Sequence, residues 1–417
     1  MRVGIVCGAG TSIPVGKPST ASLTSTVLAG VNYRRHTCGN YEFDDRVRED
    51  FESQEVYVPR VTALLQILKD EVDGFFHCGR HSLSNEAEFY KTFGRHQTNY
   101  EDLYFCARQL SDSDHFEYEN PAVQALYEKL LKMPAVLKIL QHKPGELHEN
   151  WELTPLLNEV CTYIRDVVEN ELWKTPNRLW ALSFLLSASR DGSLSKIDIY
   201  TLNHDTILEE LFRSFGVPYS DGFCDHRGNV LHWNRNDLSH SNAKVRIFKL
   251  HGSVDWYSFP SPGPVWQSQC VGKSLDRDPY HARNELGERH ELWHVRGPLM
   301  LMGTFNKLLE YNYGIFAELQ VMFHQNLLTT DYLVVCGYSF GDKVINARLL
   351  DWLCSSESHR LAVVDPNASR MEELARGAIR RKWERLIGDE KVIPFVKGIE
   401  QADWYSVKNC LLRDKGT

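Results

Sequence analysis

Short apolar runs that end in a glycine or a small polar residue stand at the start of the chain and again throughout its second half. These runs cover residues 3–7, 197–202, 245–250, 332–336 and 360–364. Continuous apolar runs of this length are typical of strands that are buried on both faces of a sheet. Segments with apolar residues three and four apart, notably 206–215 and 305–328, separate several of them. This alternation of strand and helix predicts an α/β fold with a Rossmann-like parallel sheet.

The part of the chain between the first two strands has helical periodicity instead. Apolar residues recur at helical spacing in 20–29, 58–72, 100–110, 122–140, 156–173 and 179–187. No convincing strand interrupts the pattern from about residue 45 to residue 190. We therefore predict a Rossmann-like domain formed by 1–34 and 191–417, and a large helical insertion domain at 35–190. Residues 258–298 are rich in proline, glycine and polar residues, and we expect them to form loops around the site.

Length and composition narrow the class of protein. A chain of 417 residues exceeds a usual single domain, and 42% apolar with 24% charged residues is ordinary for a globular protein. The net charge of -8 excludes a global basic field, so we do not expect this chain alone to bind nucleic acid directly. The local cluster Arg380 to Lys382 is interpreted as a solvated helix face.

The cysteines and the first residues indicate the compartment. The ten cysteines show no C-x-x-C spacing, which is typical of a reducing compartment. Cys7 and Cys336 stand in apolar runs, where cysteine behaves as a small hydrophobe. Residues 1–7 are too short for a signal peptide, and no apolar run approaches the length of a membrane span. We expect a soluble, cytoplasmic protein.

The first candidate motif is a glycine turn, Gly8-Ala9-Gly10-Thr11-Ser12, directly after the first strand. Glycines permit positive φ and a close approach of backbone N–H groups to a pyrophosphate, and a following helix would add its dipole. Ile13 replaces the third glycine of the dinucleotide fingerprint, which disfavours an ordinary nicotinamide dehydrogenase. Pro18 after Gly16-Lys17 disfavours a P-loop. A simple tight turn is the alternative.

Polar residues at other predicted strand ends suggest that a site is built around this turn. Asn203 and Asp205 follow 197–202, and His251 follows 245–250. Each has a structural alternative, because Asn and Asp are favoured as helix caps and a lone histidine is more often structural. Carboxyl ends of parallel strands share one edge of a sheet, where open α/β folds bind ligands.

Two further strand ends extend the pattern. Gly337, Ser339 and Asp342 follow 332–336, and Asp365 and Asn367 follow 360–364. Acidic and amide side chains at such positions hydrogen-bond ribose hydroxyls in nucleotide-binding sheets, and turn chemistry is the alternative.

Taken together, these motifs resemble a known family, the sirtuin-like NAD-consuming domains of bacterial anti-phage systems. The resemblance rests on GAGTS (8–12), NYEDL (99–103), TLNHD (201–205), KLHGS (249–253), GYSFGD (337–342) and VDPN (364–367), which occur in the order of the family. As a set these motifs are specific, whereas each one alone is weak.

The resemblance assigns roles to individual residues. It implies that Asn203 and His251 are the catalytic pair and that Asp205 positions the nicotinamide ribose. It also implies a pyrophosphate site formed by Gly8, Ala9, Gly10 and Ser12, and an adenosine site lined by Gly337, Ser339 and Asn367. Sirtuin deacetylases carry a four-cysteine zinc module, and no cysteine pair here could supply one, so no metal is predicted.

Two other metal-like patterns are weaker. His290 to His294 reads H-E-x-x-H, but Gly297-Pro298 follows and would end the required helix, so a strand or loop is favoured. The scattered residues His36, Cys38, His77, Cys78 and His81 have no spacing that fixes their register.

The resemblance therefore implies an NAD+ glycohydrolase that releases nicotinamide and ADP-ribose in abortive anti-phage defence, with NAD+ as its substrate. The alternatives are a sirtuin-type protein deacylase and a nonenzymatic subunit that binds NAD+ or ADP-ribose. Asp365 favours NAD+ over NADP+ without deciding between them. The resemblance further implies a homo-oligomer and a HerA-type ATPase as partner, because constitutive NAD+ hydrolysis would be toxic.

Overall fold

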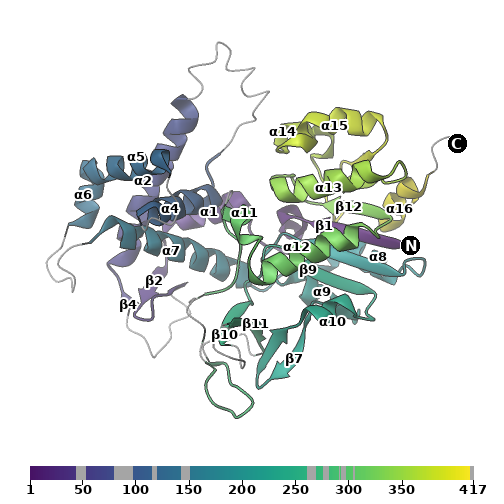
Figure 1. Cartoon of the computed structure of the whole chain (residues 1–417), viewed down its shortest axis with the longest axis horizontal. Coiled ribbons are helices and arrows are strands. Elements are labelled where there is room, and N and C mark those ends of the chain that lie inside the picture. The colour runs from purple at the N-terminus through teal and green to yellow at the C-terminus, as the bar shows by residue number, and fades with distance from the viewer. Residues whose placement is uncertain are drawn as a thin grey trace. The chain divides into compact units, whose positions relative to one another are not determined.

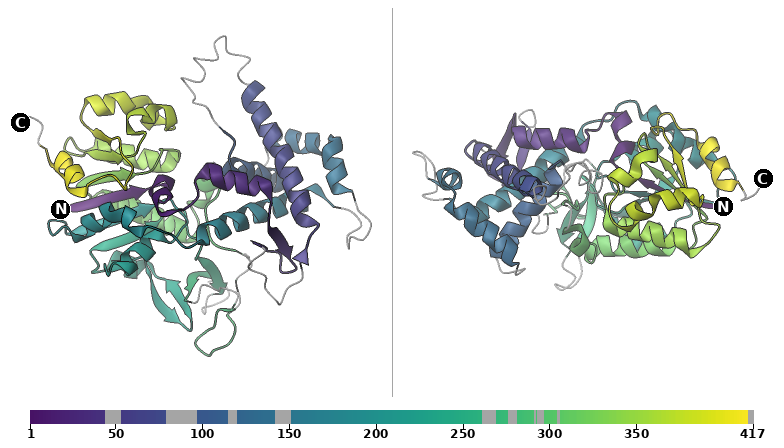
Figure 2. Two further views of the ribbon diagram at one scale, coloured as in Figure 1. Left: turned by 180° about the vertical axis from the view of Figure 1, so that it is seen from behind. Right: turned by 90° about the horizontal axis from the view of Figure 1, so that it is seen from above.

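The computed structural model describes residues 1–43, 53–78, 97–114, 120–141, 151–260, 269–275, 281–290, 292, 297–303 and 306–413. The chain divides into two compact units, which Figures 1 and 2 show in three views. The first unit consists of Met1–Ser19, Leu172–Leu301 and Leu308–Thr417, and the second of Thr20–Glu171 and Met302–Lys307. The first unit holds the central sheet and the second is mainly helical.

The central sheet has seven strands in the order β14-β13-β12-β1-β5-β9-β6. Every pairing in this sheet is parallel. The predicted α/β fold with a parallel sheet is therefore confirmed. The strands are β1 (Arg2–Cys7), β5 (Lys196–Thr201), β6 (Tyr219–Ser220), β9 (Val245–Lys249), β12 (Tyr332–Cys336), β13 (Leu361–Val364) and β14 (Val392–Phe395).

Helices cover both faces of this sheet. Along β1, Val3, Ile5 and Cys7 join the core on one face, and Val6 joins the core on the other. Because both faces are covered, the strands are continuous apolar runs with no alternation of polar residues. One face packs against α12 (Gly314–Leu327), α13 (Lys343–Ser355) and α15 (Ala378–Gly388), and the other against α8 (Ser183–Arg190), α9 (Ile207–Ser214) and α16 (Trp404–Leu412).

Strand β1 lies at the point where the strand order reverses. From β1 the chain continues to its neighbour β5 and then β9 on one side, and it later returns to β12 on the other side of β1. Ligands of open α/β sheets bind outside the carboxyl ends of the strands at this point. The fold therefore places the turn after β1 at the expected ligand position.

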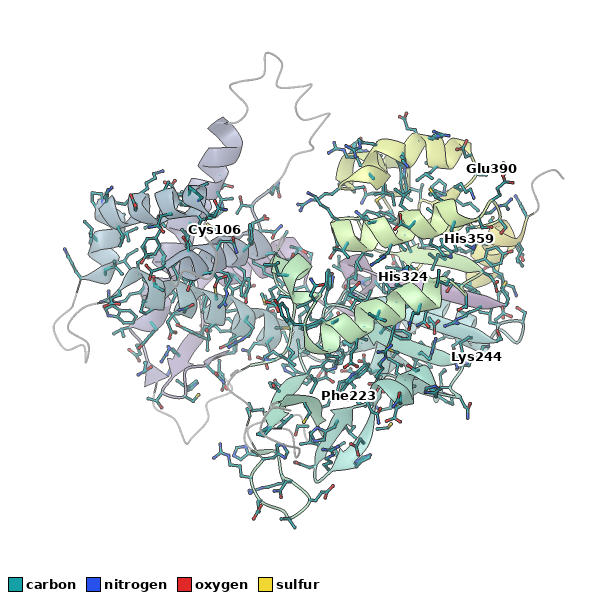
Figure 3. All side chains as sticks on the ribbon, viewed as in Figure 1. Cys106, Phe223, Lys244, His324, His359 and Glu390 are labelled. Atoms are coloured by element: carbon teal, nitrogen blue, oxygen red, sulfur yellow. The ribbon has the colours of Figure 1, made fainter. Side chains whose placement is uncertain are left out.

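A smaller antiparallel sheet, also in the first unit, has the order β10-β11-β8-β7. Its strands are β7 (Phe223–Arg227), β8 (Val230–Trp233), β10 (Tyr257–Pro260) and β11 (Gln269–Ser274), and the short helix α10 (Arg235–Ser239) follows β8. Phe223, which is labelled in Figure 3, packs against Trp233 and Trp256. The expectation of loops alone across 258–298 is wrong for β10 and β11, because aromatic packing orders this region.

The second unit contains the helices predicted between residues 20 and 173, together with one small sheet. Its helices are α1 (Thr20–Ala29), α2 (Tyr57–Cys78), α4 (Tyr100–Asp114), α5 (Pro121–Lys132), α6 (Pro134–Leu140) and α7 (Leu153–Trp173), with α7 running to the boundary of the unit. Its sheet has the order β3-β2-β4, with β2 (Tyr33–His36), β3 (Tyr41–Phe43) and β4 (Ser53–Gln54). The expected helix 122–140 is two helices because Pro134 starts a new one.

The division of the chain falls at 19/20 and 171/172, whereas the sequence predicts 34/35 and 190/191. Helix α1 belongs to the helical unit because the Val27 carbonyl accepts from the Tyr163 hydroxyl and the Thr24 hydroxyl accepts from the Tyr100 amide. Helix α8 belongs to the sheet unit because Phe184 and Leu185 pack into the core of the sheet.

Candidate active site

The predicted site residues stand at the carboxyl ends of five neighbouring strands. Gly8 follows β1, Asn203 follows β5, His251 follows β9, Gly337 follows β12 and Asn367 follows β13. These strands are adjacent in the sheet, so the loops that follow them gather along one edge.

The glycine turn after β1 packs directly against the loop after β12. Gly8 has a φ of -109°, and Gly10 lies in a short 3-10 helix, η1 (Ala9–Thr11), so neither glycine uses the positive φ that this residue permits. A Cβ added to Gly8 would lie 2.7 Å from the Gly337 carbonyl oxygen, and one added to Gly10 would lie 2.8 Å from the Gly337 Cα. Both positions require glycine because their backbone lies too close to the backbone of Gly337 for a side chain to fit.

Most amides of this turn already have backbone acceptors. Gly8 N donates to the Cys336 oxygen at 3.0 Å, Gly10 N to the Gly337 oxygen at 2.9 Å, and Ser12 N to the Ala9 oxygen at 3.0 Å. A pyrophosphate bound by these amides would have to replace those hydrogen bonds. Ala9 is the exposed residue of the turn.

The helix predicted at 20–29 is confirmed as α1 (Thr20–Ala29). Two short 3-10 helices precede it: η1 lies within the turn, and η2 (Ile13–Val15) follows the turn, whereas α1 belongs to the other unit. No α-helix begins within residues 8–19, and a helix dipole acts only close to the first turn of its helix, so the contribution of a dipole at residues 8–12 stays a prediction.

Asn203 is oriented by the glycine turn. Its Nδ2 donates to the Gly8 carbonyl oxygen at 2.9 Å and to Ser12 Oγ at 2.8 Å. Its backbone amide donates to Thr201 Oγ1 at 3.1 Å. The side chain is half-buried, and both amide hydrogens have acceptors in the turn, so Asn203 does not cap α9. The turn after β1, which is remote in sequence, therefore positions this amide.

Asp205 both contacts a predicted site residue and bonds to the start of a helix, so the site role and the capping role predicted for it are combined. Its Oδ2 accepts a hydrogen bond of 2.7 Å from Ser12 Oγ, and its Oδ1 accepts one of 3.2 Å from the Ile207 amide at the start of α9. The Ser12 hydroxyl therefore donates to Asp205 and accepts from Asn203. Ser12 and Asp205 are both buried, and together they orient the half-buried amide.

The loop after β9 is tied to the loop after β5. Lys249 Nζ donates to the Asp205 carbonyl oxygen, and the His204 carbonyl oxygen accepts from Ser253 Oγ at 3.2 Å and from the Val254 amide at 2.9 Å. Gly252 has a φ of 81°, which favours glycine. Residues of KLHGS thus hold the backbone of TLNHD in place.

A buried charge cluster lies beneath these loops. Lys249 Nζ is 3.3 Å from Glu209 Oε1, and Lys273 Nζ is 2.7 Å from Asp221, 3.5 Å from Asp255 and 3.8 Å from Glu209. Burial raises the pKa of Glu209, and the two lysines oppose that rise. Burial alone would lower the pKa of Lys273, but Asp221, Asp255 and Glu209 outweigh it and raise that pKa. The ion pair with Glu209 and the hydrogen bond to the Asp205 carbonyl oxygen together fix the position of Lys249 Nζ.

His251 lies next to the loop after β5 and contacts a tyrosine and a carboxylate. Its ring centroid is 6.3 Å from that of His204. Its Nε2 is 2.6 Å from the Tyr311 hydroxyl and 3.2 Å from Asp342 Oδ2. Sequence reasoning missed Tyr311, which stands between two helices with no motif around it.

The residues assigned to the adenosine half lie along the same edge. Gly337 has a φ of 57° and packs on the glycine turn, whereas Ser339 and Asn367 are exposed. Asp365 Oδ1 accepts a hydrogen bond of 2.7 Å from the Asn367 amide, which is turn chemistry. Hydrogen bonds join Gly8, Ser12, Asn203 and Asp205 directly; Ser339 and Asn367 share the sheet edge with them.

Among the described residues, no group of three or more His, Cys, Asp or Glu side chains could hold a metal ion. Much of the H-E-x-x-H string, His81 and the side chains of His77 and Cys78 lie outside the described residues. Cys7 and Cys336 are free and buried in the core, and burial raises the pKa of the Cys7 thiol to about 12. No helix in the described part of the chain has the length and apolar character that a membrane span requires.

Comparison with known families adds one finding. A family model described as a SIR2-like domain matches residues 198–385. The match contains Asn203, Asp205, His251, Gly337 and Asn367, and it begins after the glycine turn at residues 8–12. No curated protein matches the chain. The matched region is thus sirtuin-like and carries the strand ends β5, β9, β12 and β13, and a SIR2-like domain implies the use of NAD+.

Proposed function

We propose that this protein is an NAD+ glycohydrolase that cleaves NAD+ to nicotinamide and ADP-ribose. One observation carries the proposal: the Asn203 amide, held by Gly8 and Ser12, lies half-exposed on a loop that the loop bearing His251 anchors. This arrangement lies at the switch point of a parallel sheet, and both residues fall within a SIR2-like region.

The reaction needs few groups from the protein. The bond between the ribose anomeric carbon and the nicotinamide nitrogen breaks, and its electron pair neutralises the positively charged ring nitrogen. A water oxygen forms the new bond to that carbon, and the water loses one proton. The protein must orient the leaving group, hold the water and accept the proton.

We assign these tasks to Asn203 and His251. The Asn203 carbonyl oxygen is the acceptor end of a side chain whose amide hydrogens are both committed to the turn, so it can orient a water or the substrate carboxamide. The His251 imidazole accepts a proton, from water or from a ribose hydroxyl. Ala9, Ser339 and Asn367 are exposed, and we assign them to direct contact with the dinucleotide.

Product analysis tests the proposal. Purified protein is incubated with NAD+, alone and with candidate partners, and the products are separated by mass spectrometry. Nicotinamide and ADP-ribose in equal amounts are expected. Acyl-ADP-ribose formed from an acylated peptide would instead indicate a deacylase, and NAD+ binding without turnover under every condition would indicate a nonenzymatic subunit.

We also propose that the hydrolase acts in abortive anti-phage defence, as a homo-oligomer associated with a HerA-type ATPase. The resemblance of the motif set to defence systems supports this role. Mass measurement by light scattering after size exclusion, with and without the ATPase, tests the assembly. A monomer that does not change on addition of the ATPase and loses no activity without it would contradict the proposed partner.

A further inference from the structure

We propose that Tyr311 and Asp342 are positioning residues for His251, acting as a hydrogen-bonded chain that sets the orientation and tautomer of its ring. This inference rests on the proposed function for its catalytic consequence. The chain itself rests on geometry that is independent of any substrate.

The three groups form a tight triangle. The Tyr311 hydroxyl lies 2.6 Å from His251 Nε2 and 2.6 Å from Asp342 Oδ2, and the third side, from Nε2 to Oδ2, measures 3.2 Å. The side chains of His251 and Asp342 are only 5% and 11% exposed, and Tyr311 is buried. Hydrogen bonds in such a water-poor setting are stronger and better oriented than on the surface.

Donor and acceptor capacity fixes the direction of the chain. An ionised carboxylate can only accept, so the single Tyr311 hydroxyl hydrogen is donated to Asp342. The Tyr311 oxygen must then accept from His251, so Nε2 carries a hydrogen. This defines one tautomer of the neutral ring, as an orienting carboxylate does in other catalytic histidine systems.

The anchor of the chain is itself fixed. Asp342 Oδ1 accepts from the Val344 amide at 2.8 Å and from the Ile345 amide at 3.2 Å, which caps α13. One oxygen of Asp342 therefore holds the helix, and the other holds Tyr311. Helix α13 packs on the central sheet. The sheet that positions Asn203 therefore also fixes the ring of His251, through α13, Asp342 and Tyr311.

The catalytic consequence follows from charge. When the ring accepts a proton from water or a ribose hydroxyl, it becomes an imidazolium with a carboxylate oxygen 3.2 Å from Nε2. That carboxylate stabilises the charge formed during the reaction, so loss of the chain should lower kcat more than it changes KM.

The test uses two conservative variants of the full chain. Tyr311→Phe removes only the hydroxyl, and Asp342→Asn keeps a residue that caps helices well. We expect kcat to fall about 10- to 100-fold in each, part of what general base catalysis supplies, with KM within about twofold. Tyr200→Phe is the matched control, because its buried hydroxyl is 3.5 Å from Asp198 on another part of the sheet. Unchanged kcat in both variants would overturn the catalytic role.

A second measurement does not depend on turnover. Nitrogen-15 NMR of histidine-labelled protein, with the His251 signals assigned by their loss in His251→Gln, reports which ring nitrogen carries hydrogen. We expect the Nε2-protonated tautomer in the wild type and a mixture in Tyr311→Phe. The same tautomer in both proteins would overturn the chain. If the wild type releases no nicotinamide but the tautomer shifts as expected, the proposed function fails and the chain stands.

Discussion

The two ends of the same parallel strands use polar residues in opposite ways. Toward the amino end, Asp198 of β5 is completely buried and accepts hydrogen bonds from Arg2 at 2.6 Å and from Arg246 at 2.7 Å. The amide oxygen of Asn326 accepts from both arginines, at 2.9 Å and 3.3 Å. Lys244, labelled in Figure 3, precedes β9 at this end.

Toward the carboxyl end, carbonyl oxygens and hydroxyls join the charged groups as partners. Asn203 donates to a backbone oxygen and to Ser12, and Lys249 donates to the Asp205 carbonyl. At the amino end the opposite charges pair with one another inside the sheet, whereas at the carboxyl end the ion pair of Lys249 with Glu209 and the neutral polar groups position loops. A buried polar residue is structural where opposite charges satisfy one another, as Asp198 does with its arginines. It is a candidate site residue where it orients a half-exposed neighbour, as Ser12 does with Asn203.

The largest effect is expected at the carboxyl end, on activity alone. Asn203→Ala and His251→Ala should each lower NAD+ turnover about 10²- to 10⁴-fold, the range that acid and base catalysis supplies. Neither residue belongs to the apolar core clusters, so the melting temperature should change by only a few degrees. Initial rates of nicotinamide release and thermal unfolding measure the two quantities.

Asn236→Ala and His240→Ala are the matched controls, because both residues are exposed on or beside α10. Full activity in either active-site variant would contradict the assignment of that residue.

The amino end should show the reverse. Asp198→Ala leaves Arg246 buried without its carboxylate, which should lower the free energy of unfolding by about 3–5 kcal/mol. The kcat of the protein that remains folded should be unchanged. The free energy of unfolding is measured by denaturant for this variant and for the control Asp331→Ala. Asp331 is exposed and accepts a hydrogen bond from the Arg2 amide. Equal losses in the two variants would show that the buried pair has no special role.

Gly337→Ala should affect both stability and activity. Its φ of 57° strains any other residue, and a Cβ would lie 2.4 Å from the Thr11 nitrogen. We expect a loss of about 1–3 kcal/mol in stability and weaker NAD+ binding, because the glycine turn must shift. Gly216→Ala is the control: its φ is 65°, but nothing lies within 4 Å of its added Cβ. Binding by calorimetry should change only in Gly337→Ala.

The smallest effect is expected at the junction of the turn with β12. Thr11 Oγ1 donates to the Cys336 carbonyl oxygen at 2.8 Å in a buried position. Thr11→Val removes this bond while keeping the shape, and should cost about 1 kcal/mol of unfolding free energy. Thr11→Ser keeps the hydroxyl and should recover most of it. An identical melting temperature for the wild type and Thr11→Val would show that the turn needs no such bond.

Several elements could be predicted from local pattern alone, and others could not. The apolar runs that became β1, β5, β9 and β12 are buried on both faces, so their composition is unambiguous. The short strands β10 and β11 lie in a segment rich in proline and glycine, and aromatic contacts such as Phe223 with Trp256 stabilise their sheet. Helix 305–328 is interrupted because Gly314 has a φ of 51°, which periodicity does not reveal.

The sequence by itself determined the parallel α/β class and the order of polar residues at the strand ends, because burial on two faces and a turn after each strand are local properties. Only the tertiary structure decided which polar groups meet: Ser12 joins Asn203 to Asp205, Tyr311 reaches His251, and Asp198 closes on Arg2 and Arg246. These contacts link residues far apart in the chain, and their geometry depends on strand order and register, which no local pattern encodes.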